Sequence, residues 1–313
     1  MSQLRAAVIG VGYLGRFHAQ KYKMIESCKL IGVCDVREDS AKAVAEELDV
    51  AFFTDFKDLV GKVDLVTVAT TTTTHYEVAK FFLQNGVHVN VEKPIAATSA
   101  QAQELCDLAQ KYNLKFQVGH IERFNPAFVA AKEKMKTPLF IECHRLAKFN
   151  PRGADVSVIL DLMIHDIDVV QTLVKSPVKS VYAVGTPVLT KTVDIANARV
   201  EFENGTVANI TASRVSQTAQ RKFRVFQKDQ YLSLDFGGGE INLVTKTGEF
   251  EGGNLPMSTE SWNLDKGDAL LVETKSFVNS VLNDAPPEVT GNDGLIALKL
   301  AEQIDEQIRE KYC

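Results

Sequence analysis

Two short segments of this sequence carry residue types that could move a proton to or from a small molecule. Glu92-Lys93-Pro94 directly follows an apolar run, and Asp161 and His165 lie four residues apart in a segment that is otherwise apolar. Residues four apart share one face of an α-helix, so Asp161 could hold the ring of His165 and stabilise its charged form. An imidazole with a pKa near ~6.5 suits a general base, and a lysine ammonium suits a donor to a developing oxyanion. We therefore predict acid–base chemistry, such as the oxidation of an alcohol, with Lys93, His165 and Asp161 as the catalytic residues.

The residue types leave the choice of base open. We favour His165 as the base and Lys93 as the donor that orients the substrate. If Lys93 is desolvated beside the positively charged ring of a bound cofactor, its pKa falls, and Lys93 could itself be the base. Two other interpretations of the helix are a buried core histidine bonded to Asp161 and a metal-binding pair. A metal site lacks a convincing third ligand, so we predict none.

A glycine-rich motif near the start predicts a dinucleotide cofactor. Gly10-Val-Gly12-Tyr-Leu-Gly15 has the pattern GxGxxG, directly after an apolar run and before an amphipathic segment. In that pattern the glycines allow a tight turn, the approach of a pyrophosphate and close packing of the helix on the strand. Asp35 ends the next apolar run, twenty residues after Gly15, where a carboxylate meets the adenosine ribose. We predict NAD rather than NADP, because a 2′-phosphate would face Asp35, although Arg37 could pair with such a phosphate.

A parallel sheet would bring these residues together. Runs rich in Val and Ile, without strict polar alternation, occur at 6–9, 30–34, 65–69, 87–91 and 116–118. Segments with apolar residues at three- and four-residue spacing separate them, which indicates βαβ units and a doubly wound sheet. The residues expected to contact the cofactor share a place at the end of such a strand or the start of the next helix. They are Gly10, Gly12, Tyr13, Leu14, Gly15, Asp35, Arg37, Thr70, Thr71, His75, Glu92 and Lys93.

Residues after about 120 follow another pattern. A strong helix is predicted at 158–174, and strands, several of them alternating, are predicted at 181–188, 196–203, 206–213, 221–227 and 231–235. Asn204-Gly205 supplies a hairpin turn, and helices at 269–282 and 294–310 end the chain. We predict an NAD-binding α/β domain over 1–120. Residues 121–313 should form an α+β domain with a large, predominantly antiparallel open sheet, for substrate binding and oligomerisation. The C-terminal helix could pack back on the first domain.

Composition excludes several classes of protein. The 313 residues are 45% hydrophobic and 24% charged, and their net charge of −5 argues against a general nucleic-acid or anionic-membrane binder. No apolar run approaches the ~18 residues that cross a bilayer. The sequence starts without the pattern of a signal peptide, and its five cysteines are widely spaced without a CxxC pair. We therefore expect a cytoplasmic protein without a disulfide framework.

Several arginines lie near the predicted substrate pocket. These candidates are Arg123, Arg145, Arg152 and Arg214, and His120 precedes the first of them. A neutral ligand would leave such guanidinium groups unpaired, whereas a diphosphate would suit their forked geometry. The alternative is ion pairing with the 40 acidic residues of the chain. We predict His120, Arg123, Arg145 and Arg214 as substrate-binding residues.

The combination of motifs resembles a known family. The chain is similar to the Gfo/Idh/MocA oxidoreductases in three features: GxGxxG after the first strand, Glu92-Lys93-Pro94 after the strand predicted at 87–91, and Asp161 with His165 on one helix. The tail segments 268–277 and 289–294 resemble that family as well. The resemblance implies a Rossmann domain, an open-sheet domain whose face supports a homodimer or homotetramer, and a nicotinamide flanked by Lys93 and His165.

A narrower resemblance suggests a substrate. Residues 119–126, 161–168 and 212–216 are similar to the branch of the family that oxidises the 3-hydroxyl of UDP-N-acetylglucosamine. Its implied substrate is a UDP-N-acetylhexosamine that becomes a 3-keto sugar. Two alternatives remain, a dehydrogenase of a free monosaccharide or inositol and a catalytically silent dinucleotide-binding regulatory protein. The presence of both Lys93 and His165 counts against the silent protein.

Overall fold

The chain divides into two compact units. The computed structural model describes residues 3–151, 156–253 and 256–312. The first unit comprises Met1–Ile121 and Asp268–Leu298, and the second comprises Glu122–Gly267 and Lys299–Cys313.

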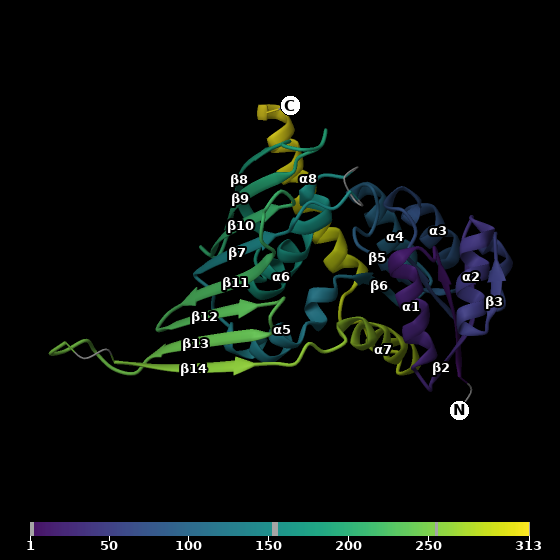
Figure 1. The fold of residues 1–313 in the computed structure, drawn as a ribbon, viewed down its shortest axis with the longest axis horizontal. Helices are drawn as coiled ribbons and strands as arrows, with labels where there is room; N and C mark the ends of the chain where they lie inside the picture. Colours follow the sequence, from purple (N-terminus) through teal and green to yellow (C-terminus); the bar gives the residue numbers. More distant parts are fainter. Residues whose placement is uncertain (1–2, 152–155, 254–255, 313) are drawn as a thin grey trace. The chain divides into compact units, whose positions relative to one another are not determined.

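The first unit contains a doubly wound parallel sheet. Its six strands run in the order β3-β2-β1-β4-β5-β6, and every pairing between them is parallel. Figure 1 labels β2, β3, β5 and β6 of this sheet. The strands are β1 (Leu4–Ile9), β2 (Cys28–Cys34), β3 (Ala51–Phe53), β4 (Leu65–Val68), β5 (His88–Glu92) and β6 (Phe116–Gly119). The order reverses between β1 and β4, and ligands of such sheets bind beyond the carboxyl ends of the strands at that point. The predicted fold class of this part is confirmed.

Amphipathic helices alternate with these strands. They are α1 (Tyr13–Lys23), α2 (Glu38–Leu48), α3 (Thr72–Gln84) and α4 (Ser99–Lys111), with a short 3₁₀ helix, η1, at Phe56–Leu59. Each α-helix buries one apolar stripe. The strands β4 and β6 are buried throughout and β1 over its last four residues, because helices cover both faces of a parallel sheet.

Part of the C-terminal tail belongs to the first unit. The helix α7 (Ala269–Leu282) packs on α1, and its residues Phe277 and Val278 join a core that includes Ala6 and Val8 of β1. The helix α8 (Gly291–Tyr312) contributes residues to both units. The apolar stripe of α7 therefore completes the core that the first 121 residues begin.

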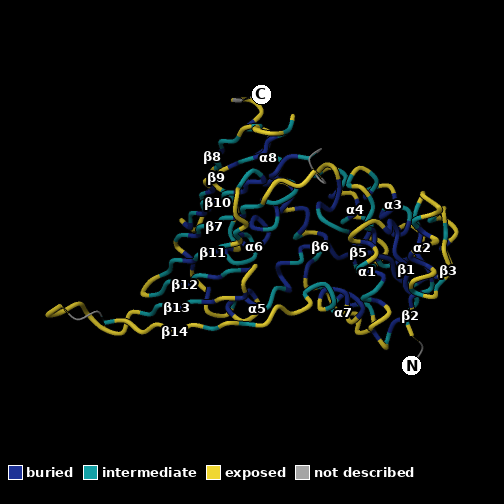
Figure 2. The backbone as a smooth tube through the Cα atoms, in the orientation of Figure 1, coloured by how far each residue is buried: buried dark blue, intermediate teal, exposed yellow. Residues whose placement is uncertain are grey.

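The second unit contains an open eight-stranded sheet in the order β14-β13-β12-β11-β7-β10-β9-β8. Its strands are β7 (Phe140–Leu146), β8 (Val178–Thr186), β9 (Ile195–Phe202), β10 (Val207–Ser213), β11 (Gln220–Gln227), β12 (Gln230–Asp235), β13 (Glu240–Lys246) and β14 (Met257–Asn263). The β7–β10 pairing is parallel and the other pairings are antiparallel. This confirms the predicted open sheet. We did not predict β13 or β14, and most of β14 is exposed (Figure 2) and lacks an apolar alternation.

Helical segments complete the second unit. They are η2 (Ile121–Phe124), α5 (Pro126–Ala131), η3 (Lys132–Lys134), η4 (Ile159–Met163) and α6 (Ile164–Val174). The predicted single helix at 158–174 begins instead with a π-helical turn, η4, before α6 continues in α-helical geometry. Single π turns occur often at functional sites. Across the described residues, no helix is both long enough and apolar enough to span a membrane.

Candidate functional site

The glycine-rich turn between β1 and α1 has the geometry of a pyrophosphate cradle. Gly10 has a φ of +83°, and a Cβ there would lie 2.7 Å from the backbone of Ala69 and Thr70. A Cβ on Gly15 would collide with the carbonyl oxygen of Gly10. A Cβ on Gly12 would meet nothing within 4 Å, so the space over this residue is free for a ligand. The turn therefore fits the phosphate-binding role predicted for the three glycines.

The residues beside this turn include an anchored carboxylate. Asp35 directly follows β2, and its Oδ2 and Oδ1 accept hydrogen bonds of 2.9 Å each from the backbone N–H groups of Val11 and Arg37. The guanidinium of Arg37 is largely exposed, and its Nε lies 3.8 Å from Oδ1 of Asp35. Tyr13 and Leu14, in the first turn of α1, are also exposed. Asp35 is thus held at the end of β2, with an exposed cation beside it.

A second loop of this edge follows β4. Thr71 is the N-cap residue of α3, and Thr70 directly precedes it. The Thr74 hydroxyl donates to Oγ1 of Thr70 at 2.8 Å and can donate to the Thr71 carbonyl oxygen at 2.9 Å. These bonds fix the loop at the start of a helix, where free backbone N–H groups attract anions.

His75 lies behind that loop and is only 1% exposed. Its Nδ1 lies 2.8 Å from the carbonyl oxygen of Pro94, and its Nε2 lies 3.1 Å from that of Thr70. Burial lowers its pKa, although both carbonyl contacts favour the charged form. A neutral imidazole can donate to only one of these two oxygens. His75 therefore ties the loop after β4 to the loop after β5, and its own ring is not open to a ligand.

The loop after β5 carries Glu92 and Lys93. The Glu92 side chain points into the unit, where its Oε1 accepts a 2.8 Å hydrogen bond from Nε2 of His18 on α1. Its Oε2 faces the backbone N–H of Lys93 at 3.2 Å. Burial opposes ionisation of Glu92, but His18 and Lys93 hold its pKa below the usual range. The backbone of Lys93 is thus held by the Glu92 carboxylate, which His18 in turn holds inside the unit.

The other two predicted catalytic residues, Asp161 and His165, belong to the second unit and lie where two helical segments meet. Asp161 is in the π-helical turn η4, and His165 is in the first turn of α6. Two arginines anchor α6 by forked contacts. Arg145 of β7 donates from Nε and Nη2 to Asp166 at 2.9 and 2.8 Å, and Arg123 donates in the same way to Asp168 at 2.9 Å.

The predicted substrate-binding arginines already have partners within the chain. Arg145 also donates from Nη1 to Glu122 at 2.7 Å, and its pKa stays above the usual value although burial opposes this. Arg214 pairs with Asp194 at 3.1 Å and donates to the carbonyl oxygens of Val156 and Val193. The expectation that a neutral ligand would leave these guanidinium groups unpaired is wrong, because nearby carboxylates and carbonyls occupy them. The fourth arginine, Arg152, lies outside the described residues.

The last of the predicted substrate-binding residues, His120, is buried. His120 directly follows β6 and is 1% exposed. Among the described residues, no group of three His, Cys, Asp or Glu side chains could hold a metal ion.

Comparisons with known proteins identify the family. A profile described as "Oxidoreductase family, NAD-binding Rossmann fold" matches residues 4–120, and one described as "GFO/IDH/MocA C-terminal domain" matches residues 141–232. UDP-N-acetylglucosamine 3-dehydrogenase from Acidithiobacillus ferrooxidans is 38% identical over 305 residues, which cover 97% of this chain and 97% of that protein. The chain belongs to the Gfo/Idh/MocA oxidoreductase family.

Other Gfo/Idh/MocA proteins show how far the likeness extends. The solved structure of the Acidithiobacillus ferrooxidans enzyme superposes with a TM-score of 0.93 at 37% identity and covers 99% of both chains. Myo-inositol 2-dehydrogenase from Thermotoga maritima is 27% identical over 328 residues, 98% of this chain and 97% of that protein. Scyllo-inositol dehydrogenase from Lactobacillus casei, solved with NAD(H) and scyllo-inositol, shares the fold with a TM-score of 0.83 at 22% identity, covering 99% of this chain and 98% of that chain. The predicted family and enzyme class, an oxidoreductase with an NAD-binding Rossmann fold, are confirmed.

Some polar residues in this Gfo/Idh/MocA chain were not found by sequence reasoning. His18 and Glu273 are buried inside the first unit, and Glu122 and Asp194 are buried beside arginines in the second. A signal existed for two of them. His18 is four residues before the buried Tyr22, and Glu273 is four residues before the buried Phe277, so each occupies an apolar-stripe position of its helix.

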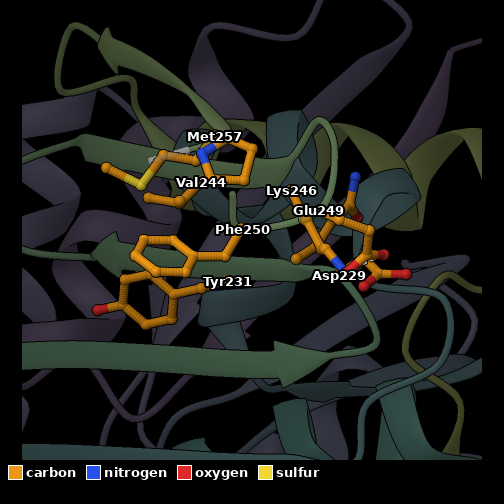
Figure 3. Close-up of a pocket in the computed structure, with 9 residues that line it drawn as sticks. Asp229, Tyr231, Val244, Lys246, Glu249, Phe250 and Met257 are labelled. Atoms are coloured by element: carbon orange, nitrogen blue, oxygen red, sulfur yellow. Dashed lines mark hydrogen bonds and ion pairs between the residues drawn. The ribbon is translucent and has the colours of Figure 1, made fainter. Parts of the chain in front are cut away.

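The second unit also has a surface hollow that lies apart from the predicted site residues. Figure 3 shows Phe250, Tyr231, Val244 and Met257 around it, with an ion pair of 2.7 Å between Lys246 and Glu249 at its side. None of the residues predicted for catalysis, cofactor or substrate lines it.

Proposed function

We propose that this protein is an NAD-dependent dehydrogenase that oxidises the 3-hydroxyl of a UDP-N-acetylhexosamine, with UDP-N-acetylglucosamine as the first substrate to test. The observation that carries the proposal is the 38% identity over nearly the full length of a UDP-N-acetylglucosamine 3-dehydrogenase. Inositol dehydrogenases, two of which are 27% and 24% identical over nearly the whole chain, supply the second candidate class.

NAD is the proposed cofactor because the first unit suits a dinucleotide without a 2′-phosphate. The space above Gly12 is free, and the Asp35 carboxylate is fixed by two backbone N–H groups. A 2′-phosphate would approach this fixed negative charge, whereas ribose hydroxyls could donate to it. We propose that Tyr13, Leu14, Thr70 and Thr71 line the same cofactor, and that His75 supports the loops from behind.

We propose the following division of roles in catalysis. His165 removes the proton of the substrate hydroxyl, and Asp161 stabilises the resulting imidazolium. Lys93 donates to the substrate oxygen and keeps it oriented while the carbon–hydrogen bond breaks. NAD, when bound, supplies an acceptor for the hydride, so that the alcohol gives up two electrons and two hydrogens and becomes a ketone. Arg123 and Arg145 hold α6, and with it His165, through Asp168 and Asp166.

The assay follows the absorbance of NADH at about 340 nm, because hydride transfer to NAD is the proposed step. Purified protein with NAD receives UDP-N-acetylglucosamine, UDP-N-acetylgalactosamine, UDP-glucose, free N-acetylglucosamine, myo-inositol and scyllo-inositol in turn. We expect the highest kcat/KM with a UDP-N-acetylhexosamine, and we expect UDP alone to inhibit. A free sugar or an inositol that is oxidised at least as efficiently as every UDP-sugar contradicts the proposed substrate.

We further propose that the protein works in the cytoplasm as a homodimer or homotetramer that associates through the open sheet of the second unit. Size-exclusion chromatography with light scattering measures this directly, and a monomer at micromolar concentration contradicts it.

A further inference from the structure

A polar cluster occupies the interior of the first unit, where an ordinary parallel sheet is apolar. His18 of α1 is fully buried, and Glu273 of α7 is 1% exposed. Glu92 and Asn90 of β5 lie beside them, and Gln117 of the neighbouring strand β6 completes the cluster. Buried polar groups are costly unless they are paired, so such a cluster calls for a function.

The contacts within the cluster link it to Lys93. His18 donates to Glu92 at 2.8 Å, and the other oxygen of Glu92 faces the Lys93 N–H at 3.2 Å. Gly119 of β6 pairs with Glu92 across the sheet, and a Cβ there would lie 3.1 Å from Oε2 of Glu92. The glycine therefore leaves room for the inward position of this carboxylate.

Glu273 is the least compensated member. Neither of its carboxylate oxygens has a hydrogen-bond partner with good geometry among the described residues. Burial raises the pKa of Glu273 to about 8, and the charge of Glu92 adds to the effect, while His18 and Asn90 oppose it. At neutral pH the cluster thus consists of a protonated Glu273 and a His18–Glu92 pair. Above about pH 8 it gains one negative charge.

We propose that Glu273 is a positioning residue for Lys93, and that the proton it exchanges within the His18–Glu92–Glu273 cluster controls the electrostatic environment of that lysine. The proposal rests on the catalytic role proposed for Lys93 above. A charge on Glu273 strengthens the negative potential beside Glu92, whose carboxylate touches the Lys93 backbone, and attracts the Lys93 ammonium towards the sheet. The protonated form of Glu273 removes this additional attraction.

Other titratable groups around the cluster have different roles. Tyr22 of α1 bonds to Thr67 at 2.8 Å, and burial raises the pKa of its hydroxyl, so it stays neutral. His75 of α3 acts on Glu92 through its charge, but its own pKa is lowered by burial. Lys21 of α1 forms an ion pair of 2.7 Å with Asp268, the N-cap residue of α7. Burial opposes protonation of His18, but Glu92 and Glu273 hold its pKa above the usual value, so His18 and Glu273 are the two groups of this cluster that exchange protons.

The test uses the full-length protein without substrate or cofactor. Its lysines are converted to ¹³C-dimethyl-lysines, which keep their charge, and the Lys93 signal is assigned by its loss in Lys93→Arg. We expect the NMR shift of Lys93 in the wild type to show a step near pH 8 that is absent in Glu273→Gln. His18→Gln should move this step to higher pH, because it removes the positive neighbour that favours ionisation of Glu273.

A variant on the same helix serves as the control. Thr274 is buried next to Glu273 and bonds to the Leu270 carbonyl, so Thr274→Ser should keep the step near pH 8. The proposal is overturned if the NMR shift of Lys93 depends on pH in the same way in the wild type and in Glu273→Gln. If Glu273→Gln does not fold, His18→Gln provides the test. A step in the Lys93 shift that stays at the same pH in His18→Gln also overturns the proposal.

Thermal unfolding gives an independent measure of the same proton. The folded-state pKa of Glu273 is raised from 4.5 to about 8, so its contribution to stability is present below pH 4.5 and is lost as pH rises towards 8. Relative to Glu273→Gln, the Tm of the wild type should fall across that window, and a constant difference contradicts the assignment. The NADH assay is separate. A protein that shows the step at Lys93 but oxidises none of the test substrates refutes the proposed function and not the proton cluster.

Discussion

The two units treat buried charge in different ways. In the second unit, four buried carboxylates each lie within 3.1 Å of a guanidinium nitrogen, and they are Glu122, Asp166, Asp168 and Asp194. In the first unit, Glu92 and Glu273 share the single imidazole of His18. Guanidinium groups keep their charge at every working pH, whereas an imidazole and a buried carboxyl exchange protons. The second unit therefore has permanent ion pairs that fix geometry, and the first has a cluster that can change its charge.

The largest effect should come from removing a permanent charge in the second unit. Arg145→Ala leaves Asp166 and Glu122 buried without their cation, which should lower the free energy of unfolding by about 3–5 kcal/mol. Urea denaturation measures this loss. The control is Arg224→Ala on the adjacent strand β11, because the Arg224–Glu142 pair is about one-third exposed and should contribute only ~0–1 kcal/mol. Equal losses in the two variants would mean that burial does not distinguish these pairs.

Replacing one catalytic candidate from each unit tests whether both units serve the same reaction. Lys93→Met and His165→Asn should each lower kcat by about 10²-fold or more, the usual scale of acid–base catalysis. Both variants should still bind NAD and melt within a few degrees of the wild type. Stopped-flow or steady-state NADH formation gives kcat, and calorimetry gives the melting temperature. A His165→Asn protein with normal turnover removes the base assignment, and one that unfolds supports a structural histidine.

At acid pH, the free energy of unfolding should depend on the ionisation of a buried carboxylate of the second unit, Asp194. Burial opposes ionisation of Asp194, but hydrogen bonds from Val188, Leu189 and Thr190 hold its pKa at about 2. Its contribution is therefore present above its unfolded value of 3.8 and is lost as pH falls from there towards 2. At pH 7 the shift corresponds to about 2 kcal/mol, which Asp194→Asn should lose. The gap between wild type and variant should narrow in urea titrations below pH 4, and a gap that stays constant to pH 2 contradicts the lowered pKa.

The smallest predicted effect concerns Asp35 and the exposed Arg37 beside it. Asp35→Ala should weaken NAD binding by about tenfold, the effect of one or two lost hydrogen bonds to a charged group, and should narrow the preference for NAD over NADP. Isothermal titration with both cofactors provides the constants. Arg37→Ala is the matched control, and it should leave NAD binding nearly unchanged while it weakens NADP. Wild-type protein that binds NADP at least as tightly as NAD shows that Arg37 outweighs Asp35.

The sequence alone determined the features that depend on short stretches of chain. Gly10, Gly12 and Gly15 identified the turn between β1 and α1, because the backbone conformation and the clearance they provide are local properties. Asp35 and Glu92-Lys93-Pro94 were placed at strand ends, because a run of buried residues predicts where a parallel strand stops. Alternation predicted several strands of the second sheet, while the polar strand β14 carried no such pattern.

Only the tertiary structure decided which charged groups meet. Arg145 is paired with Glu122 and Asp166, 23 and 21 residues away, and Glu273 lies in the same buried cluster as His18 and Glu92, from which long stretches of chain separate it. No periodicity selects these partners among the 40 acidic residues. The choice is made when β7 and α6, or α1 and α7, pack together, because burial then makes an unpaired charge costly. The first part of the predicted 158–174 helix is a π-helical turn that contains Asp161, which the four-residue spacing of Asp161 and His165 could not reveal.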